Sequence, residues 1–129
     1  MKLHSDPRPF YNTFTAYGEG YVEVNEVRYT HSVIVQPEGE VIAWPVTSFA
    51  ALSEDDFAPL LPLALEIVFF GSGQKLRFLH PRLLRGLSAM KIGTETMDLF
   101  AACRTYNILL SEERKVAAAL LIETEDKTT

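Results

Sequence analysis

The sequence predicts a layered α/β domain, and three features of the chain support this fold class. Its 129 residues are enough for one domain, residues 1–129, with a substantial buried core. Residues 18–47 contain short runs in which apolar and polar side chains alternate, as in strands. Residues 65–122 instead read as strand, helix, strand, helix, strand, which is typical of a sheet covered by its crossover helices. If those strands are parallel, their connections should be right-handed.

The first part of the chain predicts an arm followed by hairpins. Residues 1–17 are rich in proline, aromatic residues and threonine, and we expect them to form an N-terminal arm over the core. Within 18–47, Asn25-Glu26 is a plausible hairpin turn. The "PEGE" sequence at 37–40 predicts another turn, because proline suits an early turn position and glycine a later one. The following "VIAWP" reads as a strand that Pro45 ends.

The segment that begins at Ser53 predicts a short helix. Ser53 is a good N-cap, and Asp56, three residues on, completes the pattern of a capping box. The helix should end near Pro59 or Pro62. The apolar run "LEIVFF" at 65–70 then predicts a strand buried on both faces.

Two more helices and two more strands follow. "HPRLLRGLSAMK" places Pro81 at the first helical position, with four residues on one apolar face: Leu83, Leu84, Leu87 and Met90. "IGTETM" at 92–97 is a further strand, and Asp98 N-caps the helix after it. "VAAALLI" at 116–122 reads as a second buried strand, and the polar tail 123–129 should be frayed.

Composition and charge argue against several classes of function. The net charge of −5 disfavours nucleic acid and anionic membrane surfaces as partners, because both attract lysine and arginine. The start "MKLHSDPRPF" lacks the apolar core of a signal peptide, and no apolar run is long enough to span a membrane. The single cysteine, Cys103, is compatible with a reducing compartment. We therefore expect a cytoplasmic protein with no direct membrane insertion.

The helix that follows Asp98 carries an unexpected second face. On a helical wheel, one side faces the sheet and contains Leu99, Ala102, Cys103, Tyr106 and Leu110. A separate stripe contains Arg104, Asn107 and Ser111, flanked by Phe100 and Ile108. A solvated surface does not need these two apolar neighbours, so the N-terminal arm or a partner protein should cover them.

We expect Arg104 and Asn107 to belong to a recognition face, since arginine is common among the anchors of protein interfaces. One alternative is a solvated polar face on which Arg104 pairs with Glu112 or another acid. A second is an Arg104 that crosses beneath the arm and is held by buried acceptors.

The loop Gly71-Ser72-Gly73 is the one place where a phosphate loop could sit, because it follows a buried strand. It lacks the third glycine of a dinucleotide fingerprint and the Gly-Lys-Ser/Thr ending of a P-loop. The simpler interpretation is an architectural turn in which glycine supplies unusual backbone angles. The functional alternative is a small-ligand crevice between this loop and Asp98.

No arrangement of residues predicts catalysis or a bound metal or cofactor. His4, His31 and His80 lie far apart and have no cysteine or carboxylate at a metal-ligand spacing. Cys103 falls on the apolar side of its helix, where a small buried hydrophobe is expected rather than a nucleophile. We predict no catalytic residue, no metal and no cofactor.

Residues 65–122 carry a resemblance to the domain-of-unknown-function 498 family, with the archaeal 938-like fold. The most specific parts are Met97-Asp98, the run "ACRTYN" at 102–107 and the Gly71-x-Gly73 loop. The resemblance implies a three-layer α/β fold with a central mixed sheet of about five strands, helices on both sides and an added β-hairpin. In such a mixed sheet at least one strand need not run parallel to the others, which qualifies the parallel arrangement considered above. It implies no enzymatic activity.

Three interpretations of function follow. The family includes an assembly factor of mitochondrial respiratory complex I that binds other assembly proteins, so the resemblance implies a protein-interaction domain. Such a domain could serve the assembly of inner-membrane or respiratory complexes. The second interpretation is a small-ligand binder or enzyme that uses the Gly71–Gly73 and Asp98 edge of the sheet. The third is a structural domain that chiefly associates with itself, as a homodimer.

Overall fold

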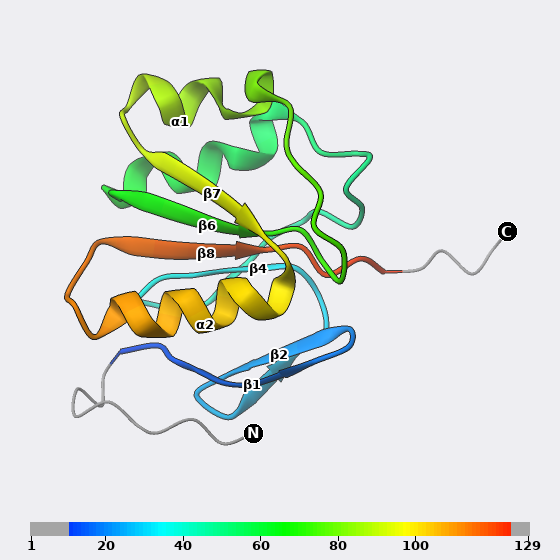
Figure 1. Ribbon diagram of the computed structural model, residues 1–129, viewed down its shortest axis with the longest axis vertical. Coiled ribbons are helices and arrows are strands. Elements are labelled where there is room, and N and C mark those ends of the chain that lie inside the picture. The colour runs from blue at the N-terminus through cyan, green and yellow to red at the C-terminus, as the bar shows by residue number, and fades with distance from the viewer. Residues whose placement is uncertain (1–10, 125–129) are drawn as a thin grey trace, which may run out of the picture.

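A five-stranded mixed sheet forms the centre of this computed structural model, which describes residues 11–124. Its strand order is β5-β4-β8-β6-β7. Strands β8 (Val116–Leu120), β6 (Ile67–Gly71) and β7 (Gly93–Met97) run parallel, with β6 in the middle. Strands β4 (Val33–Val35) and β5 (Ile42–Ala43) extend the sheet beyond β8 in antiparallel pairing (Figure 1). The sheet is therefore mixed, and the parallel arrangement expected from the strand–helix alternation holds for three strands only.

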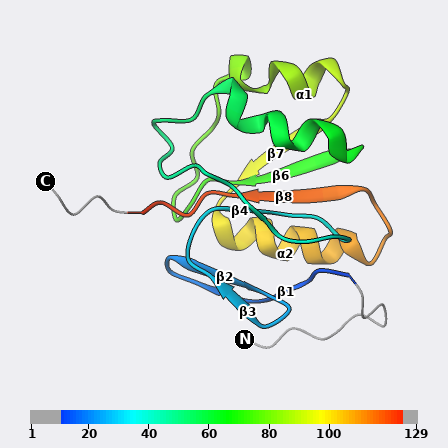
Figure 2. The same cartoon turned by 180° about the vertical axis from the view of Figure 1, so that it is seen from behind.

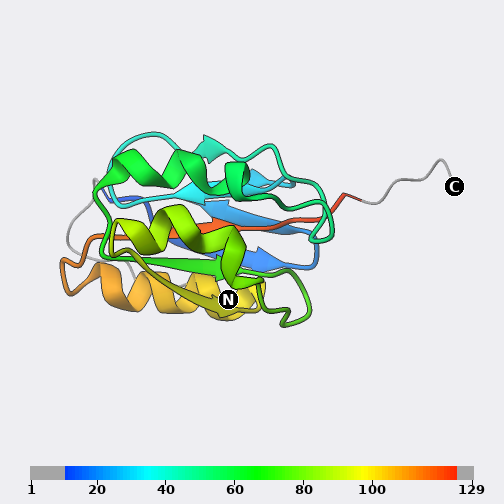
Figure 3. The same cartoon turned by 90° about the horizontal axis from the view of Figure 1, so that it is seen from above.

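Helices cover both faces of this sheet. Helix α2 (Leu99–Leu110) lies on one face. The 3₁₀ helices η1 (Glu54–Leu63) and η2 (Pro81–Leu84), with helix α1 (Arg85–Ala89), lie on the other, as the view from above shows (Figure 3). The predicted three-layer α/β class is confirmed.

A second, three-stranded antiparallel sheet packs beside α2. It consists of β1 (Phe14–Gly18), β2 (Tyr21–Val24) and β3 (Val27–Tyr29), and Figure 2 shows it from behind. The turn at Asn25 and Glu26 joins β2 to β3, and both residues have positive φ, 52° and 68°. Strands β2 and β3 are the expected hairpin, and β1 is an additional strand paired with β2.

The core owes its two layers to the pleat of β6 and β8. Alternate residues point to opposite faces, so Phe69 and Ala118 pack towards α2, whereas Val68 and Phe70 pack towards η1 and α1. All four side chains are fully buried. Strands buried on both faces must be apolar at every position, and this explains the continuous apolar runs in the sequence.

Several local predictions hold, and their contacts are visible. The Asp98 carboxylate accepts a hydrogen bond from the N–H of Ala101 at 2.9 Å, which caps α2. The Asp56 carboxylate accepts one from the N–H of Ser53 at 2.8 Å at the start of η1. The turn at 37–40 joins β4 to β5, and Gly39 has a φ of 97°.

Other predictions need correction. The expected arm, residues 1–17, ends earlier, because Phe14–Gly18 forms strand β1, whose register with β2 shifts between Phe14 and Ala16; residues 1–10 and the tail 125–129 lie outside the described residues. Met90 lies beyond the end of α1 and is 54% exposed, so it does not share the buried face of Leu87.

Gly71 marks the closest approach of β6 to α2. A Cβ at this position would lie 2.8 Å from Leu120 Cδ2, 3.2 Å from Ala102 Cβ and 3.4 Å from the Cα of Leu99. Two of these neighbours are short or backbone atoms that cannot move aside alone. Glycine at the end of β6 therefore sets the distance between the helix and the sheet.

We predict that Gly71→Ala lowers the free energy of unfolding by about 1–3 kcal/mol, because overpacking forces the helix away from the sheet. Gly86→Ala is the matched control: its Cβ would meet only Leu61, at 3.6 Å, in a helix that favours alanine. Urea melts measure both. Equal stability of the two variants would contradict the close-approach account.

Candidate functional site

The polar stripe of α2 faces strand β1. The side-chain amide of Asn107 accepts a hydrogen bond from the N–H of Phe14 at 3.0 Å and donates one to its C=O at 2.8 Å. Asn107 therefore hydrogen-bonds to the edge of β1 as a neighbouring strand would. This side chain holds the second sheet on the helix.

Tyr106 strengthens the same contact from the buried side of α2. Its hydroxyl donates to the C=O of Asn12 at 2.9 Å, and its ring meets the ring of Phe14 edge to face, with centroids 5.1 Å apart. Burial raises the pKa of the Tyr106 hydroxyl, so it stays protonated and remains a donor. The adjacent residues Tyr106 and Asn107 thus bind the chain at Asn12 and at Phe14, and hold it against α2.

The remaining residues of the stripe differ in exposure. Phe100 is half-buried and stacks on Tyr17 of β1, with ring centroids 4.8 Å apart. Arg104 is exposed, and its guanidinium donates to the Tyr17 hydroxyl at 3.1 Å. Ile108 is 62% exposed, and Ser111, also exposed, donates to its C=O at 2.7 Å.

The recognition face predicted for α2 therefore needs correction in part. The N-terminal segment covers Phe100 and engages Asn107, so these two residues serve the fold. Arg104 does not cross beneath that segment, which rules out the alternative of an arginine held by buried acceptors. Arg104 and Ile108 stay at the surface and remain a predicted contact region.

We predict that Asn107→Ala costs about 1–3 kcal/mol of unfolding free energy, because it leaves the N–H and C=O of Phe14 without their partner. Arg104→Ala, one turn earlier on the same helix, should cost within about 1 kcal/mol, as for an ordinary surface change. Thermal and urea melts compare the two. The assignment of Asn107 to the fold is wrong if the arginine variant loses as much stability.

The Gly71–Gly73 loop uses its polar groups internally. The Ser72 hydroxyl is buried, donates to the C=O of Lys75 at 2.6 Å and accepts from the N–H of Arg77 at 3.0 Å. The N–H of Ser72 donates to the C=O of Met97 at 2.8 Å, and the N–H of Leu99 donates to the C=O of Gly73 at 2.8 Å. The loop thereby links β6, β7 and the start of α2.

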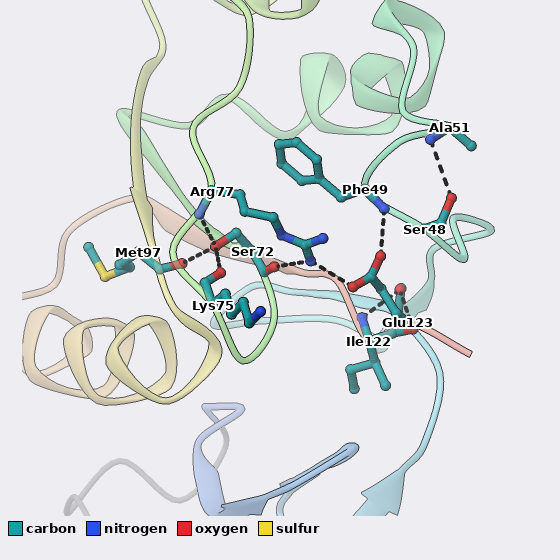
Figure 4. Close-up of polar contacts among 10 residues, drawn as sticks. Ser48, Phe49, Ala51, Ser72, Lys75, Arg77, Met97, Ile122 and Glu123 are labelled. Carbon is teal, nitrogen blue, oxygen red and sulfur yellow. Dashed lines mark hydrogen bonds and ion pairs between the residues drawn. The ribbon is translucent and has the colours of Figure 1, made fainter. Parts of the chain in front are cut away.

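Arg77 extends this linkage to two other segments, which the sequence did not reveal. Figure 4 shows one of its guanidinium nitrogens between the C=O of Ser72 and the carboxylate of Glu123, each 2.7 Å away. The other oxygen of Glu123 accepts from the N–H of Phe49 at 2.9 Å, and the guanidinium carbon lies 4.7 Å from the centre of the Phe49 ring. We call Ser72, Arg77, Glu123 and Phe49 the Arg77 clasp.

The clasp also changes the acidity of Glu123. Partial burial raises the pKa of this carboxyl, but the hydrogen bonds from Arg77 and from the Phe49 backbone outweigh burial, so the net pKa lies below its usual value. Its carboxylate stays charged at neutral pH and keeps the clasp closed.

A cavity of about 350 Å³ lies next to the clasp, between the 73–77 loop, the β1–β2 turn at Gly20 and the end of β8. Lys75, Arg77 and Glu123 contribute charged groups to its wall. Asp98, predicted to share a ligand crevice with Gly71–Gly73, does not line this cavity, and its carboxylate caps α2 instead. The loop and Asp98 adjoin, but of the two only the loop, through Gly73, is among the described residues that line this cavity.

Cys103 is unsuited to nucleophilic chemistry. It is fully buried on the side of α2 that faces the sheet, and burial raises the pKa of its thiol to about 12. At neutral pH it is therefore a thiol rather than the reactive thiolate.

Within residues 11–124, no group of three or more histidine, cysteine, aspartate or glutamate side chains could hold a metal ion. No helix in the same range is long and apolar enough to cross a membrane.

We predict that Ser72→Ala destabilises the protein by about 1–3 kcal/mol, because the C=O of Lys75 and the N–H of Arg77 lose a buried partner. Ser88→Ala, on the exposed surface of α1, is the control and should change stability little. The denaturant concentrations at the midpoints of unfolding compare the stabilities of the two variants. Equal midpoints would show that the serine does not organise the loop.

We also predict that ATP and NAD at millimolar concentration leave the melting temperature unchanged. A phosphate loop presents free N–H groups to the ligand, whereas here those of Ser72, Leu99 and Ala101 already donate within the protein. Differential scanning fluorimetry measures the shift. A saturable rise with either nucleotide would overturn the architectural interpretation of the loop.

Comparison with known proteins supports one family. The model of the family "Protein of unknown function (DUF498/DUF598)" matches residues 14–121. A Rhodobacter capsulatus protein described as uncharacterized is 34% identical over 107 residues, which cover 81% of this chain and 80% of that protein.

Two further relatives bear on function and fold. The mouse (Mus musculus) protein "NADH dehydrogenase [ubiquinone] 1 alpha subcomplex assembly factor 3" is 36% identical over 83 residues, which cover 63% of this chain and 45% of that protein. The chain thus spans less than half the length of this relative. A Bordetella pertussis solution structure, described as a Mth938-like domain, has a TM-score of 0.80 at 38% identity and covers 98% of this chain and 96% of its own. The chain belongs to the DUF498/DUF598 family and has the Mth938-like fold.

Proposed function

We propose that this chain acts without catalysis, by binding other proteins during the assembly of an inner-membrane or respiratory complex. Several relatives are described as NADH dehydrogenase assembly factors, among them proteins of mouse, human and Drosophila melanogaster. In this proposal its partners are proteins rather than nucleic acid, it needs no cofactor, and it works in the cytoplasm.

One observation carries the proposal: the side chains that could have acted in catalysis or ligand binding are buried or hydrogen-bonded within the protein. The Ser72 hydroxyl is saturated by Lys75 and Arg77, Asp98 caps α2, and Cys103 is buried with a raised pKa. Such an arrangement favours a protein that acts through its surface.

Because the chain spans 45% of the length of the mouse assembly factor, the partners of that protein do not transfer directly. The match covers 63% of this chain, and more than half of the mouse protein lies outside it. The role in assembly therefore has to be tested on this chain itself.

We predict that deletion of the gene lowers the amount of assembled NADH dehydrogenase in the membranes of the source organism. Native gels and NADH oxidation by isolated membranes measure it, with another multi-subunit complex of the same membrane as control. Return of the wild-type gene should restore the complex. Normal levels of the complex in the deletion strain would contradict the proposal.

The cavity beside the Arg77 clasp favours a second candidate, a small-anion binder. Lys75 and Arg77 place two cations at its wall against one carboxylate, Glu123, in a chain whose net charge is −5. However, Arg77 is already paired with Glu123 at 2.7 Å, so among the described lining residues Lys75 is the cation that forms no ion pair. Titration with inorganic phosphate, followed by the melting temperature, separates this candidate from the assembly role.

A further inference from the structure

Strand β7 forms one edge of the central sheet, and its outer side is open. The N–H of Gly93 donates to the C=O of Glu66 at 3.0 Å, and the C=O of Met97 accepts from the N–H of Ser72 at 2.8 Å, so these β7 residues face β6. Backbone groups alternate in direction along a strand, so Thr94 and Thr96 direct their N–H and C=O groups away from the sheet. Within residues 11–124, β7 pairs with β6 alone, so no neighbouring strand engages these outward groups.

The two edges of the sheet differ in how well they are protected. Sheets commonly block their edges with short strands, bulges, proline or lysine. The opposite edge, β5, has only two residues. Strand β7 has five residues, pairs with β6 in unbroken register and contains neither proline nor lysine. In Figure 3 it runs between α1 and α2, so an incoming strand would lie between these helices.

Glu95 places a negative charge at the middle of the edge strand β7. It is exposed, and within the described part of the chain it forms no ion pair. Its position opposite Phe69 places it on the α2 side of the sheet. In an added strand, the residue opposite Glu95 would have its Cβ about 5 Å away, where opposite charges stabilise the pair and like charges destabilise it.

The same residue argues against a second copy of this chain as the occupant. Two β7 strands paired antiparallel over their full length would be centred on Glu95, so the two carboxylates would face each other. That repulsion disfavours the register with the most hydrogen bonds. A different polypeptide that carries a cation avoids it.

We propose that the outer edge of β7 binds an extended segment of a partner protein as an added strand, with a lysine or arginine of that segment opposite Glu95. Backbone bonds to Thr94 and Thr96 supply affinity, and the charge pair sets the register. This inference rests on the proposed function, because it assumes a polypeptide partner, and it names where and by what chemistry that partner binds.

The test uses the full chain, labelled with ¹⁵N, and three capped peptides of alternating threonine and valine. One peptide has lysine at its centre and one has glutamate. The third is the lysine peptide with methyl groups on the backbone nitrogens that would face β7. We titrate each into the wild-type chain and into Glu95→Lys, a substitution at an exposed position that should leave the fold intact. Amide shifts give the affinity, and hydrogen exchange reports on Thr94 and Thr96.

The wild-type chain should bind the lysine peptide at least about threefold more tightly than the glutamate peptide, and Glu95→Lys should reverse the order. Exchange of the Thr94 and Thr96 amides should slow at saturation, and the methylated peptide should not bind. Equal affinities, unchanged exchange, or no binding by any peptide would overturn edge docking. The deletion experiment is independent of these outcomes, so a lost complex with failed peptide binding would reject this edge and leave the assembly role standing.

Discussion

The contact between the side chain of Asn107 and the backbone of Phe14 is the interaction on which the arrangement of the two sheets depends. These residues are 93 positions apart, and the amide of Asn107 satisfies both backbone groups of Phe14. Tyr106 adds a buried hydrogen bond to Asn12 and an edge-to-face contact with the Phe14 ring. Beyond these contacts, the three-stranded sheet is held on α2 by apolar side chains that it adds to the shared core, such as Val22 and Val24.

Helix α2 therefore contacts both sheets, each through a different side of the helix. Its apolar side packs on the parallel strands at the close approach set by Gly71, and its polar stripe holds β1. The Arg77 clasp performs a similar task at the carboxyl ends of these strands, where many α/β proteins bind ligands. Both regions are committed to internal contacts, so the proposed protein interactions would use other surfaces, such as the exposed Ile108 of α2 and the outer edge of β7.

The sequence predicted the features that depend on local pattern. The buried strands β6 and β8, the cap at Asp98 and the sheet-facing side of α2 all follow from runs or spacings within a few residues, and each is confirmed. Features that depend on distant partners were missed. Strand β1 was placed within the arm because its outer partner is a side chain on α2, and the clasp joins Arg77 to a residue 46 positions away.

Hydrogen exchange at the Phe14 amide tests the central role of Asn107 most directly, because the side-chain oxygen of Asn107 accepts the hydrogen bond of that N–H at 3.0 Å. The Asn25 amide is the internal reference, since it donates to the C=O of Thr13 at 3.0 Å within the same sheet. If the side-chain contact holds β1 in place, Phe14 exchanges as slowly as Asn25, since both amides are released only when the sheet opens. Exchange of Phe14 at the rate of an unstructured chain, while Asn25 stays protected, would contradict the account.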